Sequence, residues 1–251
     1  FLGDGMSNAQ IQATEAYLTT INGGSARSAS DLLKPENRLN LSKMPVTGIQ
    51  TTYDSHALMT DSASAGTAFA CGIKTKSNVI GMDHTLTKNY KSIAQLAKEQ
   101  GRKVGIVTSV SLDHATPASY YASVTSRNLM NSIATQMAAT GYEFFGGGGL
   151  VAPEGPNRAG DTANNVWSLL AANGYEVRNS RESILELKSD PRDKVVCINP
   201  VIDGASAMPY AIDKPSQNLS LAEMTEVAIA NLYSRRGGKG FFLSLIHISE
   251  P

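Results

Sequence analysis

The chain has 251 residues, and its 22 Lys or Arg and 22 Asp or Glu residues give a formal net charge of zero. This balance gives no electrostatic reason to expect a nucleic acid or an anionic membrane surface as a partner. No apolar run is long enough to cross a bilayer, and two cysteines do not make a disulfide framework. A chain of this length can bury a sizeable core as one α/β domain.

Helical and strand patterns alternate along the chain. Strands are predicted at residues 44–53, 103–109, 143–145, 175–177 and 195–198 and from residue 240. Helices are predicted at about residues 7–21, 90–100, 128–140 and 180–187 and from residue 221. This alternation is typical of a parallel sheet, so the predicted fold class is α/β, a three-layer αβα sandwich around a mostly parallel central sheet.

Four further features of the sequence have predictions of their own. Residues 22–43 are polar and are expected to form a long surface connection, and the four glycines at 146–149 are expected to form a tight turn. Asp161 is expected to cap a helix through Val166 and Leu170, and Ser220 and Glu223 have the spacing of a capping box.

Asp4 lies in the turn after the first predicted strand. Phe1 and Leu2 end that strand, and Gly3-Asp4-Gly5 forms the turn. Ligands of open α/β sheets collect at the carboxyl ends of strands, so a carboxylate here is well placed to bind a metal ion. An aspartate between glycines is also a common turn residue, and the spacing alone favours that interpretation.

Residues 60–68 form a run of small side chains that begins with Thr60-Asp61-Ser62. Ser62 is expected at the start of a helix, where free N–H groups attract an anion such as phosphate. A serine there can be a nucleophile if a base or a metal ion activates its hydroxyl. The alternative is that Asp61 or Ser62 only caps the helix.

Four segments match one family in the same order along the chain. They are Phe1-Leu2-Gly3-Asp4-Gly5-Met6, residues 61–75, His114-Ala115-Thr116-Pro117-Ala118 and Val124-Thr125-Ser126-Arg127. With these segments the chain resembles the alkaline phosphatases, whose nucleophile segment is similar to residues 61–75. The resemblance covers residues 1–243, the N-terminal portion of a catalytic domain of that type. Residues 244–251 do not fit the family, and we expect them to be a frame error or foreign sequence.

The resemblance implies metal-dependent hydrolysis of phosphate monoesters. In that reaction Ser62 attacks phosphorus and forms a phosphoserine intermediate, which a metal-bound hydroxide then hydrolyses. Arg127 holds two phosphoryl oxygens with its planar fork, and Asp61 orients the guanidinium. Without the resemblance, Arg127 would be interpreted as a surface residue at the start of a helix.

The resemblance also implies two zinc ions and a third ion, usually magnesium. Asp4, Ser62 and Thr116 are the implied oxygen ligands, with Asp4 between two ions and Thr116 at the third. His114 stands where one branch of the family has an acid and another has histidine, and imidazole suits zinc or cobalt better than magnesium. Three roles for His114 stay open: contact with the third ion through water, recruitment of a different ion, or a local hydrogen bond only.

The implied substrates are small-molecule phosphate monoesters, the implied assembly is a homodimer, and the implied location is the periplasm or the outside of the cell. A phosphodiesterase or phosphonate hydrolase of the same superfamily and a non-catalytic phosphatase-like fragment are the alternatives. The motifs G-x-S-x-G of serine hydrolases and C-x-P-x-R of sulfatases are absent. Because a catalytic zinc wants about three protein ligands of its own, the 251 residues alone are expected to be inactive.

Overall fold

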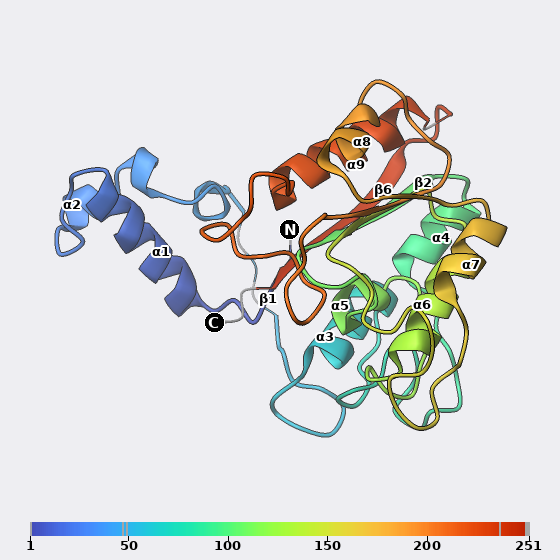
Figure 1. The fold of residues 1–251 in the computed structure, drawn as a ribbon. Helices are drawn as coiled ribbons and strands as arrows, with labels where there is room; N and C mark the ends of the chain where they lie inside the picture. The colour runs from blue at the N-terminus through green and yellow to red at the C-terminus, as the bar shows by residue number, and fades with distance from the viewer. Residues whose placement is uncertain (1, 47, 49, 236, 249–251) are drawn as a thin grey trace. The chain divides into compact units, whose positions relative to one another are not determined.

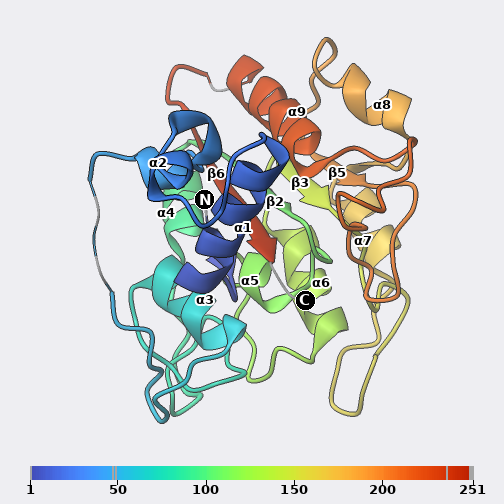
Figure 2. The same cartoon turned by 90° about the vertical axis from the view of Figure 1, so that its left-hand side faces the viewer.

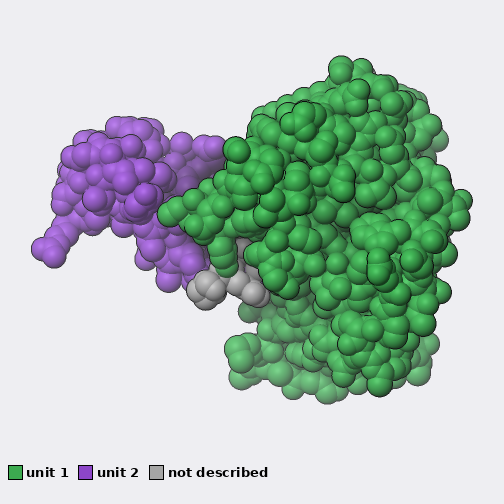
Figure 3. Space-filling model, in the orientation of Figure 1, with its two compact units in different colours: residues 1–2, 52–248 green, residues 3–51, 249–251 purple. Residues whose placement is uncertain are grey.

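The computed structural model describes residues 2–46, 48, 50–235 and 237–248. The chain divides into two compact units, which Figure 3 shows in different colours. Unit 1 comprises residues 1–2 and 52–248, and unit 2 comprises residues 3–51 and 249–251. Within the described ranges, no helix is both long enough and apolar enough to cross a membrane.

The described part of unit 1 is built around five parallel strands. In spatial order they are β6 (Phe241–Ile248), β2 (Lys103–Thr108), β3 (Phe144–Gly147), β5 (Val195–Ile198) and β4 (Glu176–Arg178). The register between β2 and β6 runs from Lys103 opposite Phe241 to Thr108 opposite Ile246. Residues 244–248 therefore belong to a strand, of which residues 244–246 pair with β2.

Helices cover both faces of this sheet (Figures 1 and 2). One face carries α3 (Ser62–Cys71), α4 (Ile93–Glu99), α5 (Ala115–Ala118), α6 (Met130–Ala139) and α7 (Val166–Ala172), and the other carries α8 (Arg181–Glu186) and α9 (Leu221–Ser234). Phe144 packs in the core under α8 and α9, while its neighbour Phe145 packs in the core under the other helices. Successive strand residues point to opposite faces, so each strand supplies both cores. The predicted three-layer sandwich with a parallel sheet is confirmed.

Unit 2 contains most of the first 51 residues. β1 (Leu2–Asp4) crosses the boundary between the units, and α1 (Asn8–Ile21) follows, capped by Ser7 and Gln10. The predicted connection at residues 22–43 contains three short helical segments, α2 (Ala29–Leu32), η1 (Pro35–Asn37) and η2 (Leu41–Lys43). Glu15 of α1 holds this connection, because its carboxylate accepts from the backbone N–H of Leu39 at 3.0 Å and pairs with Arg38 at 2.9 Å.

The strand prediction for residues 44–53 is wrong: the residues described there, 44–46, 48 and 50–53, form no strand. The prediction for the glycine run is wrong in part, because β3 continues through Gly146 and Gly147 before the chain bends at Gly148. A Cβ at Gly148 would lie 2.1 Å from the carbonyl oxygen of Ser206. The lack of a side chain at Gly148 therefore lets two backbone segments pack closely, and only part of the glycine run forms a bend.

The cap predicted for Asp161 is also wrong. α7 begins at Val166 and is capped by Asn165, which accepts from the N–H of Ser168 at 2.9 Å. Asp161 instead accepts from the N–H groups of Asn131 and Ser132, at 2.9 and 2.8 Å, in the first turn of α6. The residue that precedes α6 is a leucine with no side-chain acceptor, so the free N–H groups of α6 are satisfied by a distant carboxylate.

Candidate active site

Asp61 and Ser62 form the start of α3. Asp61 is the N-cap: its Oδ1 accepts from the N–H of Ser64 at 2.9 Å, and the Ser64 hydroxyl accepts from the N–H of Asp61 at 3.3 Å. Ser62 is the first residue inside the helix. Among the described residues, no side chain is hydrogen-bonded to the Ser62 hydroxyl. The capping role therefore falls to the aspartate and leaves the serine hydroxyl open.

Gly66 lets α3 pack closely against α5. A Cβ at Gly66 would lie 2.5 Å from the Oγ of Ser119 and 3.6 Å from the Cα of Thr116. Thr116 is a buried residue of α5, so the bare glycine sets how near the helix of Ser62 lies to the helix of Thr116.

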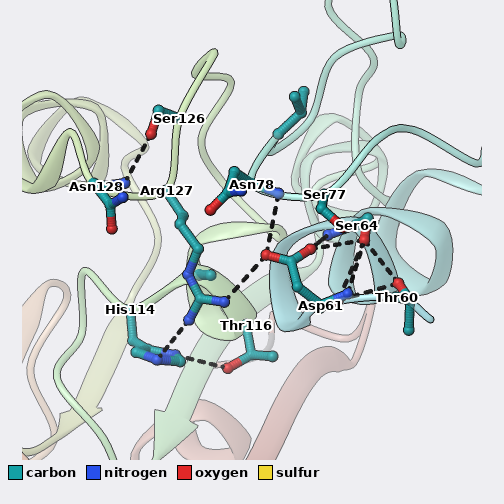
Figure 4. A network of polar contacts seen from close by, with 12 residues as sticks. Thr60, Asp61, Ser64, Ser77, Asn78, His114, Thr116, Ser126, Arg127 and Asn128 are labelled. Atoms are coloured by element: carbon teal, nitrogen blue, oxygen red, sulfur yellow. Dashed lines mark hydrogen bonds and ion pairs between the residues drawn. The ribbon is translucent and has the colours of Figure 1, made fainter. Parts of the chain in front are cut away.

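Arg127 connects α3 with the segment that contains His114. Its Nη1 lies 3.2 Å from Oδ2 of Asp61, and its Nη2 lies 3.0 Å from Nε2 of His114 (Figure 4). Burial raises the pKa of the Asp61 carboxyl, but hydrogen bonds from Ser64, Asn78 and Arg127 outweigh burial and hold that pKa below its usual value. At neutral pH the pair is thus a carboxylate and a guanidinium.

His114 and Thr116 follow β2 at the carboxyl end of that strand. Nδ1 of His114 lies 3.2 Å from Oγ1 of Thr116. Burial, and then the charge of Arg127, lower the pKa of His114 to about 4, so the imidazole is neutral near pH 7. Arg127 can only donate, so Nε2 of His114 accepts and Nδ1 carries the proton that it donates to Thr116. Nε2 has one lone pair and can either accept from Arg127 or ligate a cation.

Two further residues contribute to the site. Asn78 donates its N–H to Oδ2 of Asp61 at 3.1 Å and accepts from the N–H of Arg127 at 2.7 Å. Asp113 is buried beside His114 and accepts from the N–H of Val151 at 2.8 Å, and burial raises its pKa to about 6. Sequence reasoning missed both residues, because polar residues in loops carry no spacing signal. Asp113 joins the loops that follow two neighbouring strands, β2 and β3.

The structure thus brings together Asp61, Arg127, His114 and Thr116, with Ser62 directly after Asp61. Asp4 belongs to unit 2, at the end of β1. Among the described residues, no three His, Cys, Asp or Glu side chains gather as a group able to hold a metal ion. These residues therefore do not form a complete metal site by themselves.

Comparisons with known proteins agree on one family. The alkaline phosphatase family model matches residues 1–246. Alkaline phosphatase 4 of Bacillus subtilis (strain 168) is 32% identical over 244 residues, which cover 96% of this chain and 49% of the relative. The membrane-bound alkaline phosphatase of Bombyx mori is 30% identical over 290 residues, which cover 97% of this chain and 50% of the relative. The chain belongs to the alkaline phosphatase family.

Solved structures show the same likeness. Alkaline phosphatase from the Antarctic bacterium TAB5 matches with a TM-score of 0.73 and 27% identity, covering 98% of this chain and 63% of that one. A variant of the TAB5 enzyme, with a histidine replaced by aspartate and Mg bound in the M3 site, matches with a TM-score of 0.71 and 26% identity over 98% of this chain and 62% of its own. The chain spans about half the length of the curated relatives it matches.

Proposed function

We propose that the full-length protein containing these residues hydrolyses phosphate monoesters through a phosphoserine at Ser62. The observation that carries this proposal is the Asp61–Arg127 pair, which holds a guanidinium at the N-terminus of α3, where Ser62 is the first helical residue. A positive helix end and a guanidinium both favour a phosphoryl group. Membership in the alkaline phosphatase family supports the same chemistry.

The residues described here bind and orient the phosphoryl group. A guanidinium has five N–H groups in one plane, and Arg127 keeps donors for phosphoryl oxygens beyond those that face Asp61 and His114. Asp61 fixes the plane of the fork, and the free N–H groups of the first helical turn add donors. Positioning and charge neutralisation are the main requirements of phosphoryl transfer.

Activation of the Ser62 hydroxyl is proposed to depend on metal ions. The family resemblance implies two zinc ions and a third ion, usually magnesium. Asp4, Ser62 and Thr116 are the implied oxygen ligands from this chain, and His114 either contacts the third ion through water, recruits a different ion or makes only a local hydrogen bond. The described side chains form no complete metal site. The remaining ligands are proposed to lie outside the described residues, and the 251-residue chain alone is proposed to be inactive.

The nucleophile is tested by Ser62→Ala in the full-length protein. The variant should lose about 10⁴-fold or more in turnover of p-nitrophenyl phosphate while unfolding like the wild type, because removal of an attacking group has an effect of that size. Ser234→Ala, in α9 on the other face of the sheet, is the control. A Ser62→Ala variant that keeps most of its activity would exclude the phosphoserine. Faster turnover of bis-p-nitrophenyl phosphate by the wild type would favour the phosphodiesterase alternative.

Metal dependence is tested by removal and replacement of ions. A chelator should inactivate the full-length protein, and zinc with magnesium should restore it. Activity that survives exhaustive metal removal would contradict the proposal, and so would turnover by the 251-residue chain with zinc bound.

His114→Asp tests the third ion. A carboxylate is a harder ligand than imidazole, so activation by magnesium should rise relative to zinc or cobalt. The TAB5 variant with a histidine-to-aspartate change and bound Mg gives this experiment its precedent. An unchanged metal profile would leave His114 with only its hydrogen bonds to Arg127 and Thr116.

A further inference from the structure

The segment at residues 77–80 lies between the start of α3 and the segment that carries Arg127. Ile80 and Val124 exchange backbone hydrogen bonds of 3.1 and 2.9 Å, as an isolated antiparallel bridge. Three residues after Val124, the N–H of Arg127 donates to the carbonyl oxygen of Asn78 at 2.7 Å. The backbone position of Arg127 is thus fixed by this segment.

Asn78 holds both members of the Asp61–Arg127 pair through its own backbone. Its carbonyl oxygen accepts from the N–H of Arg127. Its N–H donates to Oδ2 of Asp61 at 3.1 Å, and the same oxygen contacts the guanidinium (Figure 4). Asn78 has a φ of +72°, in the left-handed region that is costly for most residues other than glycine. Its side chain is exposed and makes no hydrogen bond among the described residues. The backbone conformation of Asn78 therefore matters more than its amide.

Asp54 anchors this segment from the other side. It is 4% exposed, and its Oδ2 accepts from the N–H and the hydroxyl of Ser77, at 3.1 and 2.6 Å. Its Oδ1 accepts from the N–H groups of His56 and Ala57, both at 2.7 Å. These four hydrogen bonds to one buried carboxylate hold Ser77 against the loop at residues 54–57. Asn78 follows Ser77 directly and is held with it.

We propose that Asn78 is a positioning residue for phosphate binding, whose left-handed backbone conformation sets Arg127 relative to Ser62. The proposal rests on the proposed function, because it gives Arg127 the phosphoryl group as its ligand. Asp61 fixes one end of the guanidinium, and Asn78 fixes both Asp61 and the main chain of Arg127. A change in the φ of Asn78 would therefore move nucleophile and guanidinium apart.

The test compares a strained with an unstrained residue at position 78 of the full-length protein. Asn78→Val disfavours the left-handed region, and kcat/KM for p-nitrophenyl phosphate should fall about 10²-fold, as expected for a misplaced positioning group. The inhibition constant for inorganic phosphate should rise about tenfold, since a contact to the anion is weakened. Asn78→Gly adopts this φ freely and should stay within about twofold of the wild type in both measurements.

Leu86→Val is the matched control. Leu86 also has a positive φ, +64°, but it lies in the turn between Met82 and Asn89. It should lose stability as Asn78→Val does, with phosphate inhibition unchanged. If Asn78→Val and Leu86→Val bind phosphate equally well, the proposal is overturned. It is also overturned if Asn78→Gly is as impaired as Asn78→Val.

A second readout separates this proposal from the proposed function. The amide of Arg127 donates to Asn78, so its hydrogen exchange should be faster in Asn78→Val than in Leu86→Val or Asn78→Gly. If the wild type does not turn over phosphate monoesters, the proposed function fails and the exchange measurement decides on Asn78 alone. Equal exchange in the three variants would overturn the positioning role whatever the activity.

Discussion

The N-termini of α3 and α9 are built from the same parts. Each has a capping box, and in each a carboxylate pairs with an arginine from elsewhere in the chain. Asp61 pairs with Arg127 in α3, and Glu223 pairs with Arg181 in α9. The side chains are similarly exposed, 23% and 20% in the first pair and 32% and 28% in the second. The presence of a capping box and of an ion pair therefore does not distinguish the two ends.

The two ends differ in which residue caps the helix. In α9 the cap is Ser220, whose hydroxyl accepts from the N–H of Glu223 at 3.2 Å. Arg181 donates to the carboxylate of Glu223 and to the carbonyl oxygen of Asn218. The polar side chains at the start of α9 are therefore hydrogen-bonded to one another or to the backbone. In α3 the acid is the cap, and the serine falls one place inside the helix. With aspartate as the cap, the end of α3 keeps its capping box, and the Ser62 hydroxyl takes no part in it.

The largest expected difference between the two helix ends is in kcat/KM when the paired arginine, Arg127 or Arg181, is replaced by alanine. Arg127→Ala should lower kcat/KM of the full-length protein about 10²–10³-fold, because a donor to the transition state is lost. Inhibition by inorganic phosphate should weaken with it. Arg181→Ala has a similar ion pair to lose and should leave kcat/KM unchanged. Steady-state kinetics with p-nitrophenyl phosphate compare the two, and equal losses would mean that the arginines act only through stability.

Local features of the two ends were predictable from the sequence. Ser220 and Glu223 are three residues apart, and a capping box involves only such near neighbours, so its prediction is confirmed. Short apolar runs predicted strands of the parallel sheet, such as β2 and β5, and such runs also involve only neighbours along the chain. Asp161 shows the limit of this reasoning, since its partners Asn131 and Ser132 are about thirty residues away. A good cap next to α7, Asn165, took the role that Asp161 was predicted to have.

Contacts across the site were not predictable from spacing. Asp61 and Arg127 are 66 residues apart, and only the ordered motifs of a family placed them in one site. Asn78 lies outside the ordered motifs. Its role also depends on its positive φ, which the sequence does not determine. The strand at residues 44–53 was predicted from the Val, Ile and Thr residues of that segment. A segment rich in these residues forms a strand only where it can pair with a neighbouring strand.

The serine at the start of α9 should matter more for stability than the serine at the start of α3, which is the reverse of what we expect for activity. Ser220→Ala removes a cap and should lower the free energy of unfolding by about 1 kcal/mol, with activity per folded molecule unchanged. Ser62→Ala removes a hydroxyl with no described partner and should change that free energy by less than about 0.5 kcal/mol. Urea unfolding of the two variants beside the wild type measures both. A larger loss for Ser62→Ala would show that its hydroxyl supports the helix after all.

The smallest expected difference appears at acid pH. The hydrogen bond from Arg181, followed by that from the N–H of Ser220, holds the pKa of Glu223 at about 2, below its ordinary value of 4.5. A lowered pKa means that the unfolded chain binds the proton first as the pH falls. The stabilisation is therefore complete above pH 4.5 and is lost on going down toward pH 2.

Glu223→Gln has no such proton to bind, so the wild type should lose more unfolding free energy than the variant between about pH 5 and pH 3. The difference should be about 1 kcal/mol or less, because the pair is partly exposed and screened, and it should shrink in high salt. Asp61→Asn gives the matching curve of unfolding free energy against pH for α3. Because the pKa of Asp61 is lowered from 3.8, the wild type should lose stability relative to that variant as the pH falls below about 3.8. Parallel curves for Glu223→Gln and the wild type would mean that Arg181 and Ser220 do not favour the charged form of Glu223.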